Sequence, residues 1–283
     1  MLSKLIPIIR KSQLFNKIRN DELLKVVRNL PFIYHSLRFC YKKAFDLGVG
    51  GRFYGVFKSH HQALDHLGPN IPRSYEDIDL SDIHVQSFQE MHLFDYPIIF
   101  WLMKLNGNFQ SLIDLGGHIG VKYYAYSSQM PSLKKIKWNV IDVPHMLKRG
   151  RIIASERQAE NLKFSEDISL VEHAEILFIS GTLQYLDTTI GEILAKIDKL
   201  PAYVLLNKVP LHNGPNLWTI ENFGRAKIPY GISNRDEFKE IMRNRNYRLT
   251  DSWSIKSRSI SIPFYENKLD GFAMTGQVWE LVE

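Results

Sequence analysis

The chain has 283 residues, of which 45% are hydrophobic and 23% charged, and its formal net charge is +6. This composition supports a substantial core and excludes a mainly disordered protein. The length allows one large domain, or one domain of about 150 residues with an extension. The single cysteine, Cys40, excludes an internal disulfide and a cysteine-only zinc site.

No apolar run approaches the roughly 20 residues that are needed to cross a bilayer. The first residues, "MLSKLIPII", lack the cleavage site of a signal peptide. We therefore expect a cytoplasmic protein without a transmembrane segment. Residues 1–28 carry an excess of lysine and arginine, which could contact a membrane surface or an anionic partner but could equally be an ordinary solvated helix face. No zinc-finger spacing or RNP-type motif is present, so we expect no nucleic-acid partner.

The first part of the chain has helical spacing. Apolar residues recur at steps of three and four over residues 10–30, and further helices are predicted over 32–46, from about Ser59 onward, and over 82–106. A Pro-, Asp- and Ser-rich loop separates the last two. We therefore predict a helical region over residues 1–108 that covers the functional site or makes dimer contacts.

From residue 110 onward, short apolar runs alternate with helical patterns. Strands are predicted over 111–117, 135–144 and 201–211, a strand running into a turn over 174–186, and a short strand or loop over 162–168. Helices are predicted over 118–130, 145–161, 188–200 and 233–246. Two more strand-like segments, 247–264 and 271–283, follow without a helix between them. The alternation predicts a doubly wound α/β domain over residues 109–283. We expect this domain to have a mostly parallel, seven-stranded, Rossmann-like sheet with a C-terminal antiparallel hairpin at one edge.

A glycine turn follows the first of these strands. The stretch "SLIDLGGHIG" places Asp114 before Gly116, Gly117 and Gly120. A P-loop needs a lysine and a serine or threonine after its last glycine, and a dinucleotide fingerprint needs G-x-G-x-x-G, so neither motif is complete. A carboxylate beside the turn repels a pyrophosphate and suits a cationic or amine-bearing ligand. The alternative is a tight turn with a capping aspartate.

Further candidates end the next strands, because ligands of open α/β sheets bind beyond the carboxyl ends of the strands. Asp142 can accept from both hydroxyls of a ribose. Asp167 could face an adenine amino group with Ile168 against the ring, although a plain polar loop fits "FSED" as well. Ser180 and Gly181 would let the backbone approach a ligand.

Polar residues beyond the fourth and fifth strands are candidates for the substrate side of the site. Gln184 and Tyr185 project from the turn after the fourth strand, and His212 lies in a long predicted loop that also holds Asn207 and Glu221. His212 is a candidate general base, because imidazole titrates near neutrality, although a loop histidine is more often only solvated. His118 could touch the substrate or cap the helix. The ten histidines show no metal-ligand spacing, so we expect no metal.

Taken in order, these motifs resemble the class I S-adenosylmethionine-dependent methyltransferases. The stretches "IDLGGHIG", "VIDVP", "FSEDI" and "ILFISGTLQYL" carry the resemblance, which covers roughly residues 110–283. It implies an enzyme that binds S-adenosylmethionine and releases S-adenosylhomocysteine. The residues implied to hold the cofactor are Asp114, Gly116, Gly117, Gly120, Asp142, Val143, Asp167, Ile168, Ser180 and Gly181. His118, Gln184 and Tyr185 are implied to contact the substrate.

More narrowly, the chain resembles a bacterial group of methyltransferases associated with surface-polysaccharide gene clusters. "FYGVFKSHHQAL", "SGTLQYL" and "NKVPLHNGPNLWTIENF" carry this likeness, which begins near residue 50. It implies O-methylation of a sugar or a sugar-derived, small-molecule or glycan-precursor substrate. "IDVPH" also resembles the "DLPH" stretch of small-molecule O-methyltransferases, which carry a catalytic histidine after the fourth strand, where this chain has Gln184 and Tyr185. The alternatives are a cofactor-binding protein of the same fold without methyl transfer, and a nicotinamide-dependent oxidoreductase.

Overall fold

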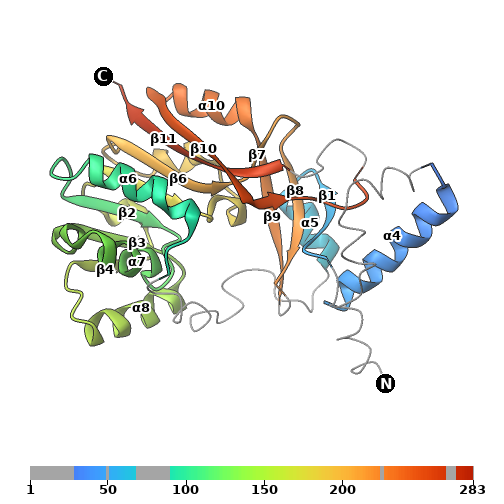
Figure 1. Cartoon of the computed structure of the whole chain (residues 1–283), viewed down its shortest axis with the longest axis horizontal. Coiled ribbons are helices and arrows are strands. Elements are labelled where there is room, and N and C mark those ends of the chain that lie inside the picture. Colours follow the sequence, from blue (N-terminus) through green and yellow to red (C-terminus); the bar gives the residue numbers. More distant parts are fainter. Residues whose placement is uncertain (1–28, 49–50, 68–89, 224–225, 266–271, 283) are drawn as a thin grey trace.

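Two β-sheets organise the chain in the computed structural model, which describes residues 29–48, 51–67, 90–223, 226–265 and 272–282 (Figure 1). The larger sheet has seven strands in the order β10-β11-β6-β5-β2-β3-β4, and the smaller has four in the order β1-β8-β9-β7. The basic segment over residues 1–28 and the helix predicted over 10–30 lie outside the described residues.

The five central strands of the large sheet run parallel, as predicted. They are β2 (Ser111–Leu115), β3 (Lys137–Ile141), β4 (Leu162–Ser165), β5 (Ile176–Ser180) and β6 (Tyr203–Val209). Parallel strands are buried on both faces and therefore read as continuous apolar runs, as "ILFIS" does in β5. The hairpin of β10 (Tyr247–Ile260) and β11 (Phe272–Leu281) adds antiparallel beside β6. The predicted fold class, a mostly parallel seven-stranded sheet with a C-terminal antiparallel hairpin, is confirmed.

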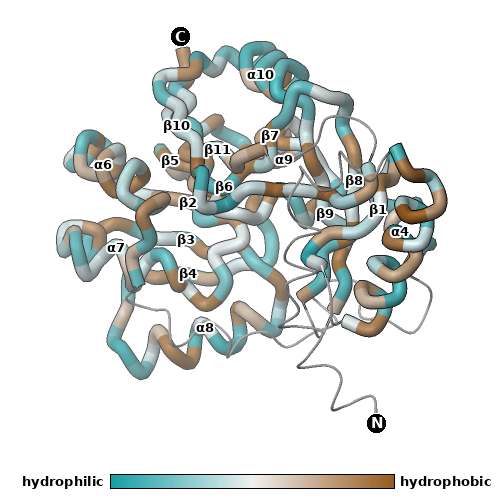
Figure 2. The backbone as a smooth tube through the Cα atoms, turned by 45° about the vertical axis from the view of Figure 1, so that its right-hand side comes forward, coloured by the Kyte–Doolittle hydropathy of each residue, from teal (hydrophilic) through white to brown (hydrophobic). Residues whose placement is uncertain are grey.

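Helices cover both faces of this sheet. One face packs against α6 (Tyr96–Lys104), α7 (Val121–Gln129), the short helix η3 (Pro131–Lys135) and α8 (Pro144–Glu156). The other face packs against η4 (Ile168–Leu170), α9 (Ile190–Ala195) and α10 (Arg235–Arg243). Only Phe238 and Met242 of α10 are buried, and the helix is drawn mostly in teal in Figure 2. The result is a three-layer sandwich with a core on each side of the sheet.

The small sheet corrects two expectations from the sequence. The segment after β6, predicted as a long loop, forms β7 (Leu211–His212), β8 (Leu217–Asn222) and β9 (Lys227–Asn234). Residues 53–57, within the predicted helical region, form β1 (Phe53–Phe57), which pairs antiparallel with β8. The sequence could not reveal this pairing, because β1 and β8 are far apart in the chain and neither has a clear apolar alternation.

The predicted N-terminal helices have mixed outcomes. Helix α4 (Pro31–Asp46) matches the predicted 32–46, and α5 (His60–Leu67) begins next to the predicted Ser59. The helix predicted over 82–106 is wrong in extent within the described residues. There the short helix η2 (Leu93–Asp95) leads directly into α6, which begins at Tyr96. Within the described ranges, no helix has the length and apolarity of a membrane span.

A buried carboxylate in the small sheet contacts both the segment before β1 and the turn that follows β5 of the large sheet. Glu221 of β8 is 2% exposed and accepts hydrogen bonds from Arg52 Nε at 2.6 Å and from Tyr185 Oη at 2.7 Å. Arg52 directly precedes β1, and Tyr185 lies in η5 (Leu183–Tyr185), which follows β5. A buried charge is tolerated only when it is paired, so this carboxylate fixes three separate segments to one another.

This arrangement predicts non-additive stability effects. Arg52→Met should lower the free energy of unfolding by about 1–3 kcal/mol, because Glu221 keeps its charge but loses a charged donor. The double variant Arg52→Met/Glu221→Gln should lose less than the sum of the two single variants, which urea denaturation of all four proteins measures. Lys42→Met is the matched control, since it removes only the exposed Lys42–Asp46 pair and a cation–π contact with Tyr54, and it should cost about 0.5–1 kcal/mol. Strict additivity at Arg52 and Glu221 would contradict the pairing.

Candidate functional site at the carboxyl ends of the strands

The glycine turn after β2 has the left-handed backbone that its glycines predict. Gly116 and Gly120 have φ values of +72° and +88°, a region that side chains disfavour. His118 adopts a φ of 59° between them. Gly120 is the N-cap of α7, so the free amide groups at the start of this helix lie at the carboxyl edge of the sheet.

Asp142, at the end of the neighbouring β3, is joined directly to this turn. Its Oδ2 accepts the backbone N–H of His118 at 2.7 Å, and its Oδ1 accepts the N–H of Val143 at 2.8 Å. Burial raises the pKa of Asp142, and the two N–H groups oppose this rise. Each oxygen keeps lone-pair capacity for another donor. The structure therefore brings Asp114, the three glycines, His118, Asp142 and Val143 together.

The Asp114 carboxyl lies beneath the turn instead of open to solvent. Its side chain is 1% exposed, and Oδ2 accepts a hydrogen bond from Trp138 Nε1 at 3.0 Å. A Cβ on Gly117 would lie 2.6 Å from this carboxyl, so glycine at that position lets the turn close over Asp114. Burial raises the pKa of Asp114 to about 7, against the opposing hydrogen bond from Trp138.

The turn after β5 lies beside the glycine turn. Gly181 has a φ of +76° and donates its N–H to the Asn207 carbonyl at 2.9 Å. A Cβ on Gly116 would overlap the Thr182 side chain, so the two turns are in close contact through that glycine. The Ser180 Oγ is buried and has no hydrogen-bond partner within the part of the chain that the structure describes. Ser180 and Gly181 therefore adjoin the residues gathered at β2 and β3.

The pair after β4 is placed differently. The exposed Asp167 caps η4 by accepting the Ser169 N–H at 2.9 Å, and these hydrogen bonds lower its pKa. Ile168 is 6% exposed and packs in the core that also contains Ile113 and Ile141. The structure gives Asp167 a local capping function, and its proposed contact with adenine stays a prediction.

Two of the predicted substrate residues, Gln184 and Tyr185, lie on the side of the small sheet together with the candidate base His212, whereas His118 lies in the glycine turn. Gln184 is 5% exposed and lines a hollow with Trp218 and Asn234, while the Tyr185 hydroxyl donates to Glu221. His212 is also 5% exposed; its Nε2 lies 2.7 Å from the Pro215 carbonyl, and burial lowers its pKa. A carbonyl only accepts, so Nε2 carries the proton and Nδ1 carries the lone pair.

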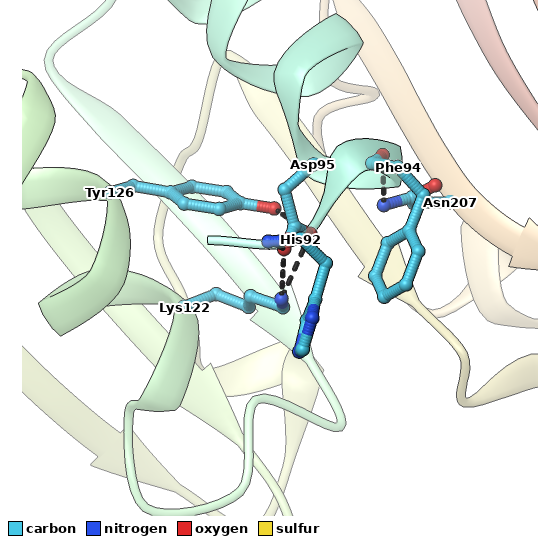
Figure 3. A network of polar contacts seen from close by, with 6 residues as sticks. All are labelled: His92, Phe94, Asp95, Lys122, Tyr126 and Asn207. Carbon is cyan, nitrogen blue, oxygen red and sulfur yellow. Dashed lines mark hydrogen bonds and ion pairs between the residues drawn. The ribbon is translucent and has the colours of Figure 1, made fainter. Parts of the chain in front are cut away.

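The sequence did not indicate that Asp95, directly before α6, is a buried carboxylate with several hydrogen-bond donors (Figure 3). Asp95 is 0% exposed and accepts hydrogen bonds from Lys122 Nζ at 2.7 and 2.8 Å, from Tyr126 Oη at 2.9 Å and from the His92 N–H at 3.1 Å. The preceding Phe94 carbonyl accepts from Asn207 Nδ2 at 3.0 Å. The only sequence signal was a charged residue inside an apolar run, which does not identify its partners.

Comparisons with known proteins give only distant similarities. No family model matches the sequence, and no characterised protein matches it. Among solved structures, the PH0226 protein from Pyrococcus horikoshii is 8% identical over 74% of this chain and 94% of that one, with a TM-score of 0.45. The N-terminal domain of EvdMO1 with S-adenosylhomocysteine bound is 10% identical over 68% and 83%, with a TM-score of 0.44. OxaC in complex with sinefungin and meleagrin is 12% identical over 72% and 50%, with a TM-score of 0.48.

Similarities at this level carry no argument about activity. The fold assignment therefore depends on the strand order and register of this chain.

The burial of Asp114 predicts a specific dependence of stability on pH. Its pKa is about 7 in the folded chain and near 3.8 when unfolded, so between these values the folded state holds a proton that the unfolded state has lost. Stability should therefore decrease as the pH rises from 5 to 8, by at most about 1.4 kcal/mol per pH unit from this group. In Asp114→Asn this contribution disappears. Thermal or urea unfolding at several pH values measures the difference, and parallel curves for both proteins would contradict the assignment.

Proposed function

We propose that this protein is an S-adenosylmethionine-dependent methyltransferase. The observation that carries the proposal is the direct contact between the left-handed glycine turn after β2 and Asp142 after β3, two adjacent parallel strands of a seven-stranded sheet. This edge can hold a nucleoside by its ribose hydroxyls and a cationic group near Asp114. The class I resemblance of the sequence motifs supports the same function.

The residues at this edge fit S-adenosylmethionine chemically. Asp142 and Val143 would hold the ribose, and Gly116, Gly117 and Gly120 would let the backbone approach the methionine portion. Asp167 and Ile168 would border the adenine, and Ser180 and Gly181 the far side of the site. When bound, the cofactor supplies the methyl group: an acceptor oxygen–carbon bond forms, the carbon–sulfur bond breaks with its electron pair going to sulfur, and S-adenosylhomocysteine remains.

We further propose that the acceptor is a hydroxyl of a sugar or sugar-derived intermediate of surface-polysaccharide synthesis. The narrower resemblance of "SGTLQYL" and "NKVPLHNGPNLWTIENF" supports this class. Gln184 and Tyr185 would orient the acceptor, with His118 beside the cofactor. The N-terminal region over residues 1–108 would cover the site or contact a second copy. The same proposal places the enzyme in the cytoplasm.

His212 is the proposed general base. Its Nε2–H donates to the Pro215 carbonyl, which orients the ring and leaves the lone pair on Nδ1. Burial lowers the pKa of His212, which favours the neutral imidazole that can take the acceptor proton. Methyl transfer from an activated donor needs mainly alignment and removal of this proton.

The cofactor proposal predicts binding of S-adenosylhomocysteine. Calorimetric titration of the full chain should detect it, and Asp142→Asn should weaken the affinity by about ten- to a hundredfold, which is about 1.4–2.8 kcal/mol. Asp198→Asn, at an exposed turn, is the matched control and should bind like the wild type. A folded wild type that gives no heat would overturn the proposal, and binding of a nicotinamide dinucleotide instead would favour an oxidoreductase.

The base proposal predicts a separation of binding from turnover. His212→Gln should reduce the rate of methyl transfer by a hundredfold or more but leave S-adenosylhomocysteine affinity unchanged. The rate is measured as transfer of labelled methyl from the cofactor into a polysaccharide-precursor extract. An unchanged rate would remove His212 from the chemistry. A wild type that binds the cofactor but transfers nothing to any fraction would identify a binding protein that has lost the reaction.

A further inference from the structure

Three cationic side chains surround one aromatic ring beside the proposed cofactor edge. The distances from the centroid of the Phe94 ring are 5.6 Å to Lys122 Nζ, 5.5 Å to Lys208 Nζ and 5.4 Å to the Arg258 guanidinium carbon. They come from α7, β6 and β10, so the fold brings them together from distant parts of the chain. The charges of Lys122 and Arg258 act unfavourably on that of Lys208, and the ring alone offers each cation only about 0.5–2 kcal/mol.

Two of these cations project from irregular strands. Thr275 pairs with Val209 and Gln277 with Leu206, so Asn207 and Lys208 form a bulge opposite a single residue of β11. Lys208 has a φ of 58°, a conformation that costs a non-glycine residue about 1–2 kcal/mol. The register of β10 also shifts between Ile255 and Ser259, the segment that contains Arg258. Bulges of this kind re-aim side chains next to functional sites.

The charges around the ring do not balance. Lys122 is paired with Asp95, but Lys208 and Arg258 make no ion pair among the residues that the structure describes. When Lys208 is protonated the cluster has three positive charges, and the carboxylates that act on Lys208 are those of Asp95 and, more weakly, Asp114. Burial, together with the charges of Lys122 and Arg258, lowers the pKa of Lys208 to about 7. An anion placed here would relieve this repulsion.

Unpaired polar atoms border the same place. Within the described part of the chain, Ser180 Oγ and Asn207 Oδ1 are buried and have no hydrogen-bond partner. Ser180 and Asn207 are register partners on β5 and β6, and the side chain of Lys208 lies against Gly181, where an added Cβ would be 3.0 Å from Nζ. A serine hydroxyl can donate to an anion, and an amide oxygen can accept from a hydroxyl. This set fits a ligand that carries both groups.

We propose that Lys208, Arg258 and Lys122 bind a phosphate group of the methyl acceptor over the Phe94 ring. A phosphate monoester carries a charge of about −1.5 to −2 at neutral pH, which would offset the positive excess of the cluster and favour the protonated form of Lys208. The inference depends on the proposed function in one respect, that the phosphate belongs to the acceptor. It makes the acceptor a phosphorylated, hydroxyl-bearing compound.

The direct test is calorimetric titration of the full chain with inorganic phosphate. The wild type should bind, and Lys208→Met and Arg258→Met should each weaken the affinity at least tenfold. Lys134→Met, an exposed lysine on η3, should have no effect. Thermal melting verifies that each variant is folded. If one of the two cluster variants does not fold, the other is enough for the test. The proposal would be overturned if the wild type does not bind phosphate, or if Lys208→Met and Arg258→Met both bind phosphate as tightly as the wild type does.

A second measurement separates the acceptor from the carboxylate of the cofactor. The affinities of Lys208→Met for S-adenosylhomocysteine and for 5′-methylthioadenosine, which lacks the amino-acid portion, should both equal those of the wild type. If Lys208→Met weakens the affinity for S-adenosylhomocysteine but not that for 5′-methylthioadenosine, the cluster holds the methionine carboxylate and the acceptor assignment is overturned. If the wild type binds phosphate but not S-adenosylhomocysteine, the cofactor proposal fails while the phosphate site stands.

Discussion

The buried carboxylate of Asp95 is the interaction on which the candidate site depends. It accepts from Lys122 and Tyr126, both on α7, and from the backbone of His92. Because a buried charge must be satisfied from every side, these donors fix η2 against the helix that begins at the glycine turn. The adjacent Phe94 is thereby fixed too, with its carbonyl on Asn207 at the end of β6 (Figure 3). One carboxylate therefore links the helix that follows β2 to the end of β6, at the edge where the candidate site lies.

Much of the fold follows from local patterns, because the parallel strands are short apolar runs and the helices are amphipathic. The glycine turn was predicted equally well, since left-handed backbone at Gly116 and Gly120 is a property of those residues themselves. The contact between Asp142 and the turn also follows from the sequence, because adjacent parallel strands end at the same edge. Each of these features is determined by residues that lie within a few positions of one another or within one predicted pair of strands.

The features that the sequence did not predict depend on long-range pairing. The two side-chain donors to Asp95 lie 27 and 31 residues away on another helix, so no spacing within "HLFDYP" indicates them. The small sheet forms because β8 pairs with β1, which lies about 160 residues earlier in the chain. The segment from β7 to β9 also contains Pro, Gly and Asn, residues that are typical of loops. The bulge at Asn207 and Lys208 is set by register against β11. Register depends on which strand lies opposite, which the local sequence of β6 does not specify.

In the proposed reaction, the two sides of the site would carry opposite charge. Asp114 and Asp142 lie at the ends of β2 and β3, and Lys208 lies across Gly181 at the ends of β5 and β6, with the two turns in contact through Gly116. A sulfonium bound on the acidic side and a phosphate bound on the basic side would attract each other across this junction before transfer. Transfer removes the sulfonium charge but leaves the phosphate unchanged. This attraction would therefore hold the reactants together before transfer and disappear in the products, which would favour alignment of the reactants and release of the products.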